Sequence, residues 1–309
     1  MATNTYLEMV RSLRLWVPQL DEFLAQALIR DRYRRILERC TWSGLRSENE
    51  FLIQISKTAG TVSVTNNSKS VVGTGTSFAA SDVGRTFKGA VGTPIYLITA
   101  VDVGLQTLTL DRVFGSITNA TSSYTVFDGY VTMPSDFKQM ICIVDPTSGY
   151  KLRHWVTQDQ LLRWDPQRNF FGLPYALVNR RYNAASGTPG IQYELWPYCS
   201  TQRNLPFYYY AQAPDLTNDS DVPIWPIRSD VIVSGALADV TRWPGTKDNP
   251  NLMYGKMDIF GSYQAEFEDK LIDLERQDEE IYQTWLAQQE WDTWPFTPLS
   301  ANFIQSHSI

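Results

Sequence analysis

Hydrophobic positions near the start of the chain recur every three or four residues, which predicts two helices there. The first should cover residues 5–16. We expect it to end before Pro18, because the residue that precedes a proline disfavours helical backbone angles. The second should cover residues 20–40. Both helices therefore have an apolar face for a core and a polar face on the opposite side.

The last third of the chain also has the spacing of helices. Residues 228–243 contain small side chains that let another helix approach closely. From residue 252 to residue 288 apolar positions recur every 3.5 residues over about five heptads, interrupted by Gln264 and Asp278. This repeat predicts a long helix that packs against other helices, with polar breaks that fix its register.

Alternation replaces this helical spacing in the middle of the chain. Residues 57–128 consist largely of Val, Thr, Ser and Gly and predict short twisted strands. They contain no His, Cys or Glu, so they lack the groups that acid–base or covalent chemistry uses most. A more aromatic β region follows over residues 138–211. Within it we expect a short helix at 157–164, with Thr157 as N-cap and Gln160 completing a capping box.

These patterns predict an α+β protein. We expect a helical-bundle body with a long C-terminal helix, plus antiparallel β regions that include an inserted β-sandwich or barrel-like module. The body should comprise residues 1–56 and 129–290, with the inserted β module at 57–128. Residues 291–309 should form an extended C-terminal arm, because prolines break any helix there.

Composition narrows the class of protein. The chain has 309 residues, 43% of them hydrophobic, and a mean hydropathy of −0.27, as a soluble globular protein would. No apolar run approaches the roughly 20 residues that span a bilayer, and we expect no signal peptide. Three well-separated cysteines favour a reducing compartment. The net charge of −6 argues against a protein that coats nucleic acid.

Charged residues mark two candidate surfaces. Arg32, Arg35 and Arg39 form a stripe on the second predicted helix. The stripe has two interpretations: a solvated face with local ion pairs, or a surface that lines a nucleic-acid channel or meets an acidic partner. The long C-terminal helix carries many acidic side chains, and three of them are candidates for the same channel or partner face. These three are Glu275, Glu279 and Glu280.

The sequence gives no signature of an enzyme, a cofactor site or a metal site. The glycines at 73–77 are not followed by the lysine of a phosphate-binding loop. His154 is the one candidate base, since His307 lies near the chain end. The aspartates at 215–221 lack the glycine and glutamate of an EF-hand, which favours a solvated turn. Glycosidases need only two carboxylates, so a carbohydrate-active or carbohydrate-binding protein remains the alternative.

The C-terminal arm is too apolar to remain in water without a partner. We expect it to be extended and to bury its aromatic side chains against another protein or a neighbouring copy. The candidate docking residues are Trp291, Trp294, Phe296, Phe303 and Ile304.

Several short segments of the sequence resemble segments of a known protein family. Residues 67–78, 82–87 and 108–111 are similar to a β module of bacteriophage virion proteins. From Pro134 onward the order of motifs resembles the head-to-tail adaptors, or head-completion proteins, of short-tailed phages, including the tail tubular protein A group. In chain order these motifs are MPSDFKQM, FGLPY, IQYELWPYC and LPFYYYAQAPDL. A predicted helix of small residues and a long acidic helix follow them.

The resemblance implies a structural virion protein that is not an enzyme. It implies a homo-oligomeric ring, commonly dodecameric, between the portal protein and a tail or nozzle protein, with the viral DNA passing through. It also implies a location at the head–tail interface of the virion, with assembly in the host cytoplasm and no membrane partner. Under the alternative, the chain would be a carbohydrate-binding or glycosidase-like virion tail protein.

Overall fold

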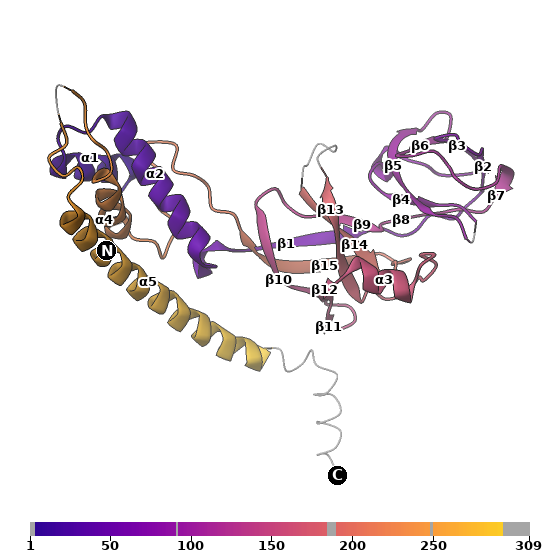
Figure 1. Ribbon diagram of the computed structural model, residues 1–309. Coiled ribbons are helices and arrows are strands. Elements are labelled where there is room, and N and C mark those ends of the chain that lie inside the picture. Colours follow the sequence, from indigo (N-terminus) through magenta and orange to yellow (C-terminus); the bar gives the residue numbers. More distant parts are fainter. Residues whose placement is uncertain (1–3, 91, 184–189, 248–249, 293–309) are drawn as a thin grey trace, which may run out of the picture. The chain divides into compact units, whose positions relative to one another are not determined.

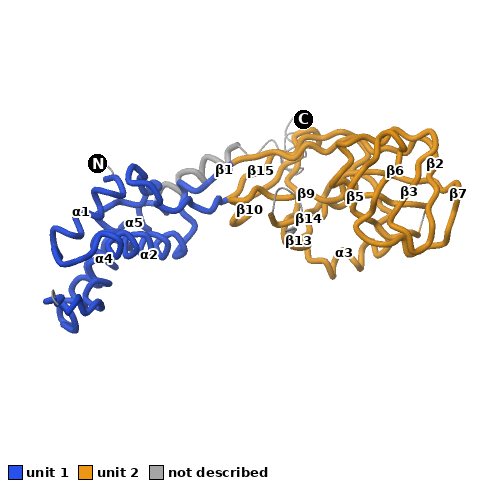
Figure 2. The backbone as a smooth tube through the Cα atoms, turned by 90° about the horizontal axis from the view of Figure 1, so that it is seen from above, with its two compact units in different colours: residues 1–47, 210–294 blue, residues 48–209, 295–309 orange. Residues whose placement is uncertain are grey.

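The computed structural model describes residues 4–90, 92–183, 190–247 and 250–292, and side chains as far as residue 279. The chain divides into two compact units (Figure 2). The first comprises residues 1–47 and 210–294, and the second residues 48–209 and 295–309.

The first unit is helical (Figure 1). It contains α1 (Tyr6–Trp16), α2 (Glu22–Arg39), the short 3-10 helix η1 (Ser43–Leu45), α4 (Ser229–Val240) and α5 (Met257–Asp292). Thr5 caps α1 through a capping box with Glu8, which satisfies backbone N–H groups that the first helical turn leaves free. The helix α4 is buried over most of its residues and contacts α1, α2 and α5. Gly235 permits this approach, because a Cβ there would lie within 2.8 Å of atoms of Arg32 and Phe267.

The second unit contains three sheets and the helix α3 (Gln158–Trp164), which begins at the expected capping box of Thr157 and Gln160. One sheet has the order β1 (Arg46–Ile53), β15 (Arg203–Ala211), β10 (Phe137–Asp145), β11 (Tyr150–Lys151). Another has the order β12 (Arg153–Val156), β13 (Ala176–Asn183), β14 (Gly190–Trp196), β9 (Tyr130–Thr132). Phe137 of the former contacts Tyr193 of the latter, with ring centroids 6.1 Å apart, so the two sheets pack together.

The third sheet has seven strands. Its order is β7 (Asn119–Ser122), β2 (Thr61–Val64), β3 (Ser70–Thr74), β6 (Thr107–Leu110), β5 (Ile95–Asp102), β4 (Thr86–Lys88), β8 (Thr125–Phe127). The strands curve around a common interior (Figure 1), into which alternate side chains of β2 and β6 point. The 3-10 helix η2 (Ala80–Asp82) lies between β3 and β4 in the chain. The core contains valines and aromatic rings, among them Phe78, Phe87 and Tyr124.

The expectation of a helical-bundle body is wrong. Among the described residues the structure has fifteen strands and five α-helices, and residues 129–209 are mainly strands rather than part of a helical body. The reason is the aromatic residues of this region, because their rings pack between neighbouring strands and between the two sheets. Phe51 of β1 stacks on Phe207 of β15 at 4.3 Å, for example. Among the described helices, none combines the length and apolar character needed to cross a bilayer.

Candidate functional site

The arginine stripe of α2 begins with a buried residue. Only 5% of Arg32 is exposed. Its guanidinium donates to Oδ2 of Asp239 on α4, from Nε at 3.0 Å and from Nη2 at 2.6 Å. The same guanidinium lies 4.6 Å from the ring centroid of Phe267 on α5. Arg32 therefore ties three helices of the first unit together.

The other two arginines of the stripe are partly exposed and also paired. Arg35 contacts Asp31 one helical turn earlier, at 2.6 Å. Arg39 donates to two acidic residues of α5, to Glu268 at 2.7 Å and to Glu275 at 2.6 Å. The hydrogen bond that Arg39 donates to Glu268 raises the pKa of Arg39 above its ordinary value. The structure thus brings two sequence-predicted candidates, Arg39 and Glu275, into direct contact.

The remaining candidates lie toward the end of α5. Glu279 is exposed, and the side chain of Glu280 lies outside the described part. The helix continues to Asp292, so the backbone of Trp291 is helical rather than extended. The other four candidate docking residues lie outside the described residues; they are Trp294, Phe296, Phe303 and Ile304.

The polar breaks in the heptads have structural partners. Asp278 is 6% exposed and accepts hydrogen bonds from the backbone N–H of Ser43, at 3.0 Å, and from the Ser43 hydroxyl. Gln264 donates to Glu268 at 3.0 Å. Asp278 therefore fixes α5 against η1, as a polar residue at a core position of a coiled coil fixes register.

A second cluster of charged residues lies where the two ends of the β module meet. Asp82 is completely buried and accepts from Lys57 at 2.7 Å and from Arg85 at 3.1 Å. Arg85 also donates to Asp128 at 2.7 Å. Burial alone would raise the pKa of Asp82, but these bonds and one from the backbone of Ala79 lower it. Lys57 and Val126 exchange backbone hydrogen bonds, so both ends of segment 57–128 lie side by side.

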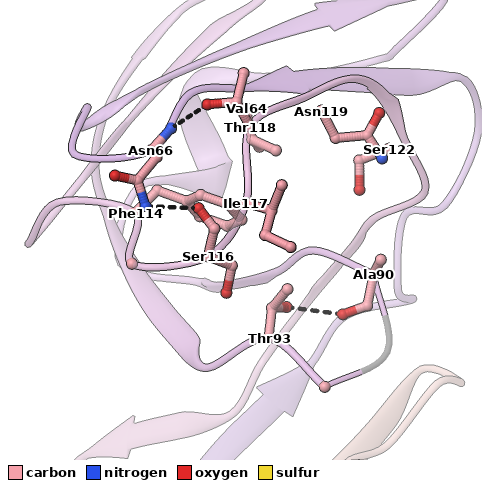
Figure 3. A pocket seen from close by; sticks show the side chains of 12 residues that line it. Val64, Asn66, Ala90, Thr93, Phe114, Ser116, Ile117, Thr118, Asn119 and Ser122 are labelled. Atoms are coloured by element: carbon pink, nitrogen blue, oxygen red, sulfur yellow. Dashed lines mark hydrogen bonds between the residues drawn. The ribbon is translucent and has the colours of Figure 1, made fainter.

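A depression of about 890 Å³ opens on the β module (Figure 3). Its lining contains no Asp, Glu, Lys, Arg or His. The side chain of Asn66 is committed to the backbone carbonyl of Ser116 at 2.9 Å, and Ile117 is 88% exposed. Phe114 is buried, so the depression presents no aromatic platform for a sugar ring. It offers hydroxyls, amides and aliphatic side chains, and no acid–base pair.

His154 and the aspartates at 215–221 are the sequence-predicted candidates for catalysis or metal binding. Burial lowers the pKa of His154, and its Nδ1 is buried without a hydrogen-bond partner in the described part, so nothing orients it as a base. Asp215 pairs with Arg34, and Asp221 accepts from the backbone of Asn218 at 2.7 Å. Among the described residues, no group of three His, Cys, Asp or Glu side chains could hold a metal ion.

Sequence comparison places the chain in a family. No curated protein matches the sequence closely enough to count as a relative. The model of the SU10 adaptor protein family matches residues 79–290, which is more than half of the 309 residues. This span begins one residue before η2, includes all strands from β4 to β15, and ends within α5. The chain therefore belongs to the SU10 adaptor protein family, and it is a structural adaptor of a bacteriophage virion.

Proposed function

We propose that this chain forms a ring between the portal and the tail of a phage, where it serves as a conduit for the viral DNA and as a platform for tail attachment. The match to the adaptor family over residues 79–290 carries this proposal. The order of motifs after Pro134, which resembles that of tail tubular protein A, favours the head–tail position over other adaptor roles.

The placement of charge supports a conduit that does not grip DNA. The three arginines of the stripe, Arg32, Arg35 and Arg39, pair with acidic residues of the same chain, so their charge is largely neutralised within the helical unit. The net charge of the whole chain is −6, and Glu279 on α5 is exposed. Such a surface repels phosphate and lets a polyanion slide past, because tight binding depends on cations that neutralise phosphates.

The proposed contact with the portal or with a neighbouring copy is the C-terminal arm. Trp294, Phe296, Phe303 and Ile304 supply the aromatic and aliphatic anchors that dominate the energy of protein interfaces. The tail or nozzle protein is the proposed partner on the opposite side of the ring.

The carbohydrate alternative receives no support from the depressions of the described part. The depression of about 890 Å³ on the β module has no carboxylate in its lining. A smaller groove in the helical unit is lined by Asp230 and Glu266, but each is paired with a neighbouring cation, Arg228 or Lys270.

Deletion of the gene from the phage tests the proposal. Particles assembled without the protein should be heads that package DNA but carry no tails, as seen by negative-stain electron microscopy, and they should not infect. Expression of the wild-type chain from a plasmid should restore tailed, infectious particles. Normally tailed particles without the protein would overturn the proposal.

A further inference from the structure

Three arginines from distant segments of the chain line a second depression, which lies in the second unit. This depression, of about 280 Å³, is lined by Arg112 after β6, Arg168 after α3 and Arg180 of β13. No acidic side chain is part of its lining. The remaining lining residues are Gly92, Thr93, Pro94, Ile95, Leu162, Pro166 and Gln167.

Each guanidinium is held in place by the protein. Arg168 is 7% exposed and donates to Glu194 at 2.7 Å, and Arg180 donates to the other oxygen of the same carboxylate at 2.9 Å. Arg112 donates to the backbone carbonyl of Ile95 at 2.7 Å. These bonds use only part of the five N–H donors of each guanidinium. Fixed guanidiniums with spare donors form a preorganised receptor for an oxyanion.

The residues that line the depression and the charged groups in contact with them carry an excess of positive charge. Lys88 is 4% exposed, and its ammonium donates to the carbonyls of Gln167 and Arg168 at 2.8 and 2.6 Å rather than to a carboxylate. Four cations are therefore offset by two buried acids, Glu194 and Asp165. Burial lowers the pKa of Lys88, while the nearby Asp165 raises it and Arg168 lowers it. An anion in the depression would relieve this excess, although the whole chain is acidic.

Apolar side chains line part of this site, and exposed aromatic rings lie close to its residues in the sequence. Leu162, in the lining, is 52% exposed, and α3 also carries Trp164, which is 45% exposed. Trp164 and the 61% exposed Phe170 both pack on Trp196, with ring centroids 5.2 and 6.0 Å away. Exposed aromatic rings beside arginines are the residue types enriched in protein interfaces.

We propose that this arginine pocket, formed by Arg112, Arg168 and Arg180, binds a carboxylate from an acidic segment of a partner protein. Nucleic acid is the weaker fit, because an isolated pocket on a chain of net charge −6 lacks the extended basic track that a polyanion needs. The apolar side chains would contact hydrophobic residues on either side of the bound acid. This inference does not depend on ring formation.

The test uses the purified full chain and a synthetic peptide, Leu-Glu-Glu-Leu-Glu-Glu, with inorganic phosphate and a twenty-nucleotide single-stranded DNA as comparison ligands. Arginine Nε–H signals are followed by NMR at constant ionic strength. We expect saturable shifts of the signals of Arg112 and Arg180 with the peptide, and at least tenfold weaker peptide binding in Arg112→Gln and Arg180→Gln.

Arg163→Gln is the matched control, since Arg163 lies on α3, is paired with Asp159 and has a 78% exposed side chain. It removes the same charge outside the pocket and should leave peptide binding unchanged. Arg112→Gln should fold like the wild type, because it removes only a hydrogen bond to a backbone carbonyl and one contact with an aromatic ring. Weaker peptide binding by this variant therefore reports on the pocket and not on misfolding. The proposal is wrong if no shift saturates, if Arg163→Gln weakens binding equally, or if DNA binds more tightly than the peptide.

Discussion

The buried pair of Arg32 and Asp239 gives the sharpest prediction about stability. Their side chains are 7% and 9% exposed, and the pair joins α2 to α4 beneath Phe267. Asp239→Ala would leave the Arg32 charge buried without its partner, which costs about 3–5 kcal/mol in comparable sites. Because a domain is stable by only about 5–15 kcal/mol, this is a large part of the stability of the helical unit.

Urea unfolding followed by circular dichroism at 222 nm measures this loss, since the first unit contains four of the five described α-helices. Arg35→Ala is the control. It breaks the exposed pair with Asp31 within one helix and a longer contact of 4.0 Å to Asp239, and it should cost less than about 1 kcal/mol. Arg32→Met combined with Asp239→Ala should recover much of the stability, because neither charge is then left alone. The reasoning fails if Asp239→Ala costs no more than Arg35→Ala.

Three further predictions concern other parts of the chain. Replacing residues 58–127 with a short Gly-Ser bridge should preserve the helical signal at 222 nm, since the ends of the segment lie side by side; loss of that signal would make the module part of the core. Truncation after Gln289 should abolish attachment to the portal in a pull-down while leaving the melting temperature unchanged, and a large drop in melting temperature would place the arm in its own core. Asp82, whose pKa is lowered by folding, stabilises the fold above its unfolded pKa of about 3.9, and this stability is lost as the pH falls through the folded pKa. Asp82→Asn should therefore be less stable than the wild type at pH 7, by about 3 kcal/mol, with a gap that narrows below about pH 4 in thermal melts; a constant gap would contradict the assignment.

Local patterns predicted most of the individual elements. Periodicity located α2 within two residues at its start and one at its end, and the capping box of Thr157 and Gln160 marks the first turn of α3. Alternation likewise predicted short strands within residues 57–128, where the structure has the strands from β2 to β8. These signals succeed because they act between residues three or four positions apart, or on alternate positions of one strand.

What the sequence could not provide is pairing over long distances. Arg32 meets a partner 207 residues away, and no local pattern specifies Asp239 for it. The arginine pocket is formed by residues from three separate segments, so its members are unremarkable in the sequence. The predicted helical body failed for a related reason. The aromatic residues of 129–209 indicated strands, but not that the rings of those strands would pack on one another to form a core of their own.

Mass measurement of the purified chain, alone and mixed with a purified portal ring, tests the proposed role most directly. Alone, the chain should have the mass of one copy, 35.3 kDa, or associate only weakly, because the acidic α5 disfavours spontaneous closure of a ring. With the portal it should form a single complex that contains a full ring of copies, twelve by the family resemblance. A stable closed ring of the isolated chain would contradict the templated assembly, and failure to bind the portal would contradict the adaptor position itself.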